Sequence, residues 1–191
     1  MLARWLFLSS ILIGIPGPAC AGGPLQILQQ EFKPLVQTTL GRIDSCGVHF
    51  SAATQGEGRL FSVQGSINVL FKDMRLPTVL VKISVVEVRN GQLSRQRLIH
   101  AHLRHQNLST AEFWGANGDD GFSWLMAVRD EQAAVDAIKL AHKIFEGPWL
   151  SFNIGDGGSD YTFQLLVAEQ DNATITEFFE CQSQGLKQLK L

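Results

Sequence analysis

Three histidines that lie close together in the sequence offer the clearest chance of chemistry in this chain: His100, His102 and His105. On an extended strand, residues two apart point to the same face, so His100 and His102 could bind one metal ion, and imidazole nitrogen is a common zinc ligand. His105, just past the expected end of the strand, could supply a third ligand, with a carboxylate from Glu87 or Asp73. The same imidazoles could instead sense pH, or simply form the polar, exposed face of a hairpin. Both a metal site and a plain polar strand face are open at this point.

The cysteines indicate a cross-link rather than a reactive thiol. The chain contains Cys20, Cys46 and Cys181. If export removes Cys20, an even pair remains in an oxidising compartment, and a Cys46–Cys181 disulfide is expected. Neither residue lies in a Cys-x-x-Cys pair, whose lowered thiol pKa would favour redox chemistry. Cys46 and His49 would point to opposite faces of a strand, so no catalytic Cys–His pair is predicted.

Other motifs give weaker indications of function. The chain has no Gly-x-Ser-x-Gly, Ser-x-x-Lys or His-Glu-x-x-His signature, so no catalytic residue is predicted. Two segments rich in glycine and aspartate, 117–121 and 156–160, have the composition of calcium loops without the ligand spacing of an EF-hand, and tight turns use the same residues. Phe113 and Trp114 precede the first segment and could form a partner surface, or could pack in the core. No cofactor is predicted.

The N-terminus reads as a cleavable signal peptide, residues 1–21. One basic residue, Arg4, precedes the uncharged apolar run 5–15, and Ala19-Cys20-Ala21 has the small-x-small form that a signal peptidase accepts, with cleavage after Ala21. The apolar run is too short to span a bilayer, so a transmembrane anchor is disfavoured. A lipoprotein anchored through Cys20 is the alternative. The mature protein is therefore expected in the periplasm or secreted, with no transmembrane span.

Length and charge set further limits. After cleavage, residues 22–191 suit a single globular domain with a sizeable core. The formal net charge of the chain is −2, and a mildly acidic balance argues against a nucleic-acid or anionic-membrane partner.

The first half of the mature chain is expected to be one helical region followed by strands. In 24–40 the apolar residues recur at helical spacing, and Pro34 divides the region into two short helices. The following segments alternate apolar and polar residues, or are rich in β-branched ones, as is typical of strands. The expected strands are 43–53, 60–71, 79–89 and 93–103.

The last two of these strands are expected to form a hairpin. The Asn-Gly dipeptide at 90–91 is the preferred sequence of a two-residue type I′ turn. That turn places Val88 opposite Leu93. Further from the turn, it places Ile83 opposite Leu98, so that apolar residues meet across the pair.

The second half is expected to contain two helices among further strands, with 107–120 as a loop. A helix over 130–146 is predicted from its apolar stripe and ends at Gly147-Pro148. A final helix is predicted to be capped by Asn172 or Thr174. The strands expected here are 122–129, 149–154 and 161–168. Strands first and helices late indicate an α+β fold, with an antiparallel sheet of about six strands, a helix between strands and a C-terminal helix packed on the sheet.

The order of elements in the last third resembles a known pattern. A helix (131–146) ending at Gly147, strands 149–154 and 161–168, and a final helix carrying Cys181 are similar to the C-terminal halves of the invasion-associated locus B proteins and related small periplasmic proteins of Gram-negative bacteria. The resemblance implies an envelope or surface accessory protein without catalytic residues, and we expect a periplasmic or secreted protein that binds another envelope or host protein. A small metal-binding or hydrolytic periplasmic protein using the three histidines is the alternative.

Overall fold

The computed structural model describes residues 23–72, 76–105, 108–109, 115–118, 121–126, 131–154, 160–166 and 171–189. The predicted signal peptide with its cleavage after Ala21, and the predicted partner surface at Phe113 and Trp114, lie outside these residues. Among the described helices, none is long and apolar enough to cross a membrane.

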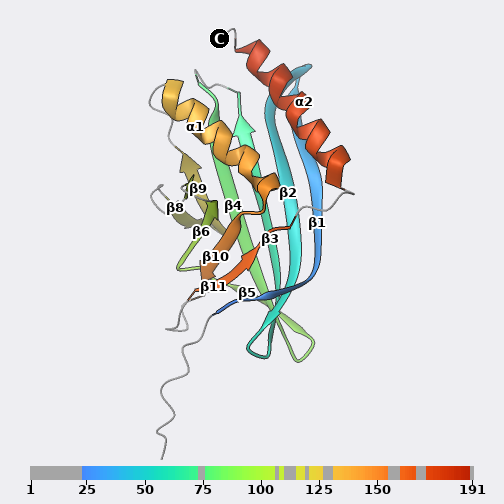
Figure 1. The fold of residues 1–191 in the computed structure, drawn as a ribbon, viewed down its shortest axis with the longest axis vertical. Helices are drawn as coiled ribbons and strands as arrows, with labels where there is room; N and C mark the ends of the chain where they lie inside the picture. The colour runs from blue at the N-terminus through green and yellow to red at the C-terminus, as the bar shows by residue number, and fades with distance from the viewer. Residues whose placement is uncertain are drawn as a thin grey trace, which may run out of the picture.

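A large antiparallel sheet, the main sheet, forms the body of the fold (Figure 1). The side of β4 that faces away from β3 pairs with two strands, one half with β9 and the other half with β5. Beyond β9 the sheet continues with β8. The strands of this sheet are β1 (Gln26–Thr39), β2 (Arg42–Gly56), β3 (Arg59–Leu70), β4 (Thr78–Arg89), β5 (Gln92–Gln96), β8 (Gly115–Gly118) and β9 (Gly121–Met126).

A smaller antiparallel sheet packs against the inner face of the main sheet. Phe61 of the main sheet contacts the rings of Phe152 and Tyr161 of the small sheet, at centroid distances of 5.8 and 5.0 Å. The chain just before β1 pairs with this sheet, since the Leu25 amide donates to the Thr162 carbonyl. In spatial order the strands of the small sheet are β11 (Tyr161–Gln164), β10 (Trp149–Asn153), β6 (His100–His105) and β7 (Leu108–Ser109).

The helices cover the other part of the same inner face (Figure 1). The α1 helix (Glu131–His142) continues into a 3₁₀ turn, η1 (Lys143–Glu146), and lies between strands β9 and β10 in sequence. The C-terminal helix α2 (Asn172–Gln188) packs on β1 and β2. The predicted disulfide joins Cys46 of β2 to Cys181 of α2, with a Cα–Cα distance of 5.7 Å. The α+β fold expected from the sequence is therefore confirmed, including the C-terminal helix on the sheet.

The region 24–40 is not helical, contrary to prediction, because it pairs with β2 along almost its whole length as β1. Of its apolar residues, Phe32 is buried, whereas Leu28 and Val36 are 51% and 40% exposed. Tertiary pairing with a neighbouring strand outweighs the helical spacing of these residues. Pro34, which suggested a break between helices, is accommodated because β1 lies at the edge of the sheet.

The predicted hairpin is only half right. Asn90 and Gly91 adopt the positive φ values of a type I′ turn, 52° and 75°, and Val88 faces Leu93 as predicted. The Ile83–Leu98 pairing is wrong, because β5 ends at Gln96 and Ile83 instead faces Phe122 of β9. After Gln96 the chain leaves the main sheet, and Leu98 is buried before β6 of the small sheet begins. The part of β4 that β5 does not reach pairs with β9.

Two smaller expectations also change. The predicted loop at 107–120 contains the short strands β7 and β8. Neither Asn172 nor Thr174 caps α2: the N-cap residue is Asp171, which makes no side-chain capping bond. The Thr174 hydroxyl instead donates to the Phe32 carbonyl at 3.5 Å, which ties α2 to the edge strand.

Candidate metal centre

The outer face of the small sheet, turned away from the main sheet, is lined by polar side chains. On β6, Ala101 and Leu103 are 2% exposed and point inward, so the residues that alternate with them point outward. The pairing of β6 with β10 arranges the side chains of this face in three cross-strand rows. In these rows His100 lies opposite Asn153, His102 opposite Ser151, and Arg104 opposite Trp149. Thr162 and Gln164 of β11 continue the second and third rows.

Two histidines and one carboxylate converge at one end of this face. His100 Nε2 lies 2.9 Å from Asp160 Oδ1, and the rings of His100 and His102 stack with centroids 6.1 Å apart. One ligand atom from each of His100, His102 and Asp160 lies within 4.8 Å of the other two. Asn153, between them on β10, donates to Asp160 Oδ1 at 3.4 Å and helps to orient the carboxylate.

The surroundings of His102 favour its neutral form. Burial lowers the pKa of His102 below its ordinary value of 6.5, the Asp160 carboxylate opposes this shift, and the charges on His100 and Arg104 add to it. A neutral imidazole is the form that coordinates a metal. The side chains of His100 and Asp160 are 46% and 28% exposed, so an ion has access from solvent.

A metal ion fits the cluster after a small closure. Zinc bonds of 2.0–2.1 Å in a tetrahedral arrangement separate two ligand atoms by about 3.3 Å. His100 and Asp160 are already closer than this, because they share a hydrogen bond that a metal ion would replace. The remaining ligand separations are at most 4.8 Å and would need to shorten by about 1.5 Å at most.

The third predicted histidine does not belong to this cluster. His105 is the last residue of β6 and, by strand alternation, lies on the opposite face from His100 and His102. Its side chain is 10% exposed, and its Nε2 lies 3.5 Å from a carboxylate oxygen of Glu146. The prediction that it turns toward the other two is therefore wrong, because β6 stays regular through this position.

Of the two predicted carboxylates, Glu87 does not join the histidines, and Asp73 is not tested. Glu87 forms a two-bond ion pair with Arg59 at 3.0 Å, and Asp73 lies outside the described residues. Among the described residues, the carboxylate that lies beside His100 and His102 is that of Asp160. The sequence signals it only as the last residue of the second glycine-and-aspartate segment, 156–160, whose other residues and Asp119 and Asp120 of the first segment are outside the described residues. Its approach to His100 depends on β10 lying between β6 and β11.

A shallow hollow of about 460 Å³ adjoins the cluster on the same face. Its floor is formed by the short side chains of Ser151 and Thr162, and larger side chains form its walls: His102, Arg104 and Trp149. His102 therefore belongs both to the cluster of His100, His102 and Asp160 and to the lining of the hollow. We call this hollow the basin.

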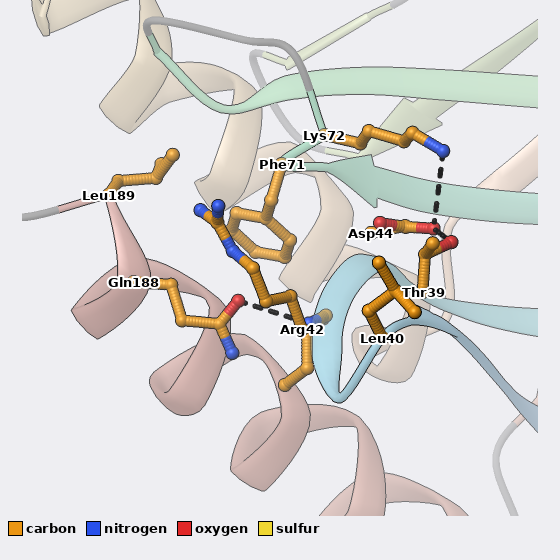
Figure 2. A pocket seen from close by; sticks show the side chains of 9 residues that line it. Thr39, Leu40, Arg42, Asp44, Phe71, Lys72, Gln188 and Leu189 are labelled. Atoms are coloured by element: carbon orange, nitrogen blue, oxygen red, sulfur yellow. Dashed lines mark hydrogen bonds and ion pairs between the residues drawn. The ribbon is translucent and has the colours of Figure 1, made fainter.

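A second hollow, of about 380 Å³, lies where the β1–β2 hairpin meets the end of α2 (Figure 2). Its polar groups already bind each other: Asp44 accepts from the Thr39 hydroxyl and pairs with Lys72 at 3.8 Å. The Gln188 side chain accepts a hydrogen bond from the Ile43 amide at 3.0 Å. The Gln188 bond holds the hairpin to the helix and the Asp44 contacts hold it to the segment after β3, so we assign the hollow a structural role.

Comparisons with protein-family models, with curated proteins and with solved structures return no match. The resemblance to the invasion-associated locus B proteins therefore stays a prediction, and function is inferred from the site alone.

Proposed function

We propose that this chain is an exported, non-enzymatic accessory protein that binds a divalent transition-metal ion through His100, His102 and Asp160. The observation that carries the proposal is the convergence of these three ligand atoms within 4.8 Å on the outer face of the small sheet. Three protein ligands leave at least one coordination position open to water or to another molecule.

The ligand set selects the class of metal. Two imidazole nitrogens and one carboxylate oxygen suit zinc and other late first-row divalent ions, whereas calcium and magnesium prefer an all-oxygen environment. Side chains outside the ligand set support the site, since Asn153 holds the carboxylate as the second-layer partners of metal ligands commonly do.

Binding fits this site better than hydrolysis does. A hydrolytic metal site needs a base beside the metal-bound water. On the described part of this face, the carboxylate and both imidazoles are themselves the ligands. The site is also open to solvent, with His100 46% exposed, whereas enzymes commonly exclude water from the reacting groups.

Export is supported by two independent features. The N-terminal residues have the composition of a signal peptide, and the Cys46–Cys181 disulfide is of a kind that persists in oxidising compartments. We infer a periplasmic or secreted protein, with lipid anchoring through Cys20 as the alternative. The mass of the N-terminal peptide of the chain isolated from its host separates the two: a free Gly22 terminus supports cleavage, and an acylated Cys20 supports the anchor.

The metal proposal is tested by calorimetric Zn²⁺ titration of the untagged, exported chain purified in its oxidised form. We expect micromolar binding by the wild type, with one ion per chain. The His100→Ala/His102→Ala variant and Asp160→Asn should each bind at least about a hundredfold more weakly, because they remove ligands themselves. His49→Ala is the matched control: it removes an imidazole from the open outer face of the main sheet and should leave the affinity unchanged. Identical, millimolar binding by the wild type and the double variant would overturn the proposal.

A further inference from the structure

The basin beside the metal-ligating cluster combines a cation, two hydroxyl groups and an aromatic wall. Arg104 stands one row beyond His102 on β6, opposite Trp149. Ser151 and Thr162 face each other across β10 and β11 on the floor. In the described part of the chain, no carboxylate pairs with Arg104, and its side chain is exposed. A guanidinium that lines a hollow and has no carboxylate partner among the described residues is available to a ligand.

A bound metal ion makes the charge at the basin more positive. Two neutral imidazoles and one carboxylate leave a divalent ion with a net charge of about +1, and Arg104 adds a second positive charge beside it. The open coordination position and the guanidinium would then both offer an electrophilic contact to the same hollow. Hydroxyl groups such as those of Ser151 and Thr162 can donate hydrogen bonds to an oxyanion.

We propose that the basin binds a small oxyanion, a carboxylate or a phosphate, that bridges the metal ion and Arg104. One oxygen takes the open metal position and a second oxygen pairs with the guanidinium, whose planar fork matches both groups. The indole of Trp149, 48% exposed, provides an apolar wall for any body attached to the oxyanion. The volume of about 460 Å³ suits a small molecule. The inference rests on the proposed metal binding and names the class of ligand that this same site takes.

Two probes test the proposal and separate its two sources: benzoate, which carries a flat apolar ring, and inorganic phosphate, which does not. Each is titrated into the chain carrying one equivalent of Co²⁺ or of Zn²⁺. Binding is followed by calorimetry, and in the cobalt form by the visible absorption bands, which respond to a change in the metal's ligands. We expect at least one probe to shift the cobalt bands and to bind at least about tenfold more tightly to the metal-loaded than to the metal-free chain. Preference for benzoate would identify a carboxylate whose body contacts Trp149, and preference for phosphate would identify a phosphate ligand.

The Arg104→Gln variant tests the second contact. It should weaken binding of the preferred probe by about tenfold or more, because a hydrogen bond between charged groups is lost, while leaving Zn²⁺ affinity unchanged. Arg95→Gln is the matched control: it removes an exposed arginine from β5 of the main sheet and should change neither affinity. Unchanged cobalt bands with both probes, or equal probe binding by Arg104→Gln and wild type, would overturn this inference while metal binding stands. Failure of the metal titration itself would overturn both proposals.

Discussion

The inner face of the main sheet and the outer face of the small sheet both arise from the alternation of side chains along strands, but they carry different residues. The inner face is filled by apolar side chains, with Val48, Phe50 and Phe61 fully buried. It is covered by α1, α2 and the small sheet, and cross-linked to α2 by the disulfide. The outer face of the small sheet carries histidine, serine and arginine, and no described helix or strand packs over it. If one surface stabilises the fold and the other binds metal as proposed, changes to the two should have separable effects.

Removing the disulfide should give the largest effect on the covered side. It closes a loop between residues 135 positions apart, and the chain-entropy estimate for such a loop is about 5 kcal/mol. We expect Cys46→Ala/Cys181→Ala to lose about 2–5 kcal/mol of unfolding free energy in urea, while Zn²⁺ affinity changes by less than about twofold because the site is distant. The wild type under reducing conditions should match the variant. An unchanged urea midpoint would contradict a stabilising role.

A substitution in the packed inner face should have the next largest effect. Gly65 of β3 lies under the Phe50 ring, and a Cβ at this position would lie 2.2 Å from Phe50 Cζ and 2.7 Å from Ile83 Cδ1. We expect Gly65→Ala to cost about 1–3 kcal/mol by overpacking, measured by urea unfolding. Ser62→Ala, on the outer face of the same strand, should change stability by less than about 0.5 kcal/mol. An equal loss of unfolding free energy in the two variants would contradict the expected difference between the inner and outer faces of the main sheet.

A change to a supporting residue of the open face should alter binding and not stability. Asn153 donates to Asp160 and stands opposite His100. We expect Asn153→Ala to weaken Zn²⁺ binding by about tenfold, because the carboxylate is less well oriented. Gln64→Ala, which removes an exposed amide from the outer face of the main sheet, serves as the control for titration calorimetry. Unaltered affinity in Asn153→Ala would show that Asp160 needs no support from β10.

The smallest effect should come from protonation of His102. Burial lowers the pKa of His102 in the folded chain below 6.5, so between the two pKa values the unfolded chain binds more protons than the folded one. Stability from the neutral, half-buried imidazole is therefore present above about pH 6.5 and is lost as the pH falls toward the folded pKa. With a chelator present, the wild type should lose more unfolding free energy than His102→Asn between about pH 7.5 and 5.5. A parallel pH profile for the two proteins would contradict this.

Much of the local structure followed from the order of residues. The Asn90-Gly91 turn, the strand β4 and the helix α1 were predictable because turn chemistry and periodicity act over a few residues. The region 24–40 was mistaken for helix because its pairing partner, β2, is chosen by long-range contacts. Likewise, periodicity placed His100 and His102 on one face, but it assumed that His105 could leave the strand.

The sequence by itself determined the fold class, the cysteine pair and the shared face of His100 and His102, because the order of elements, the number of cysteines and the alternation along a strand can be read without knowing long-range contacts. Only the tertiary structure decided that Asp160, and not Glu87, is the carboxylate beside those histidines. That contact requires β10 to pair with β6 on one side and with β11 on the other. Such a register is set by burying Leu103, Leu150 and Phe163 together against the main sheet, a choice that depends on the whole core and not on any one segment.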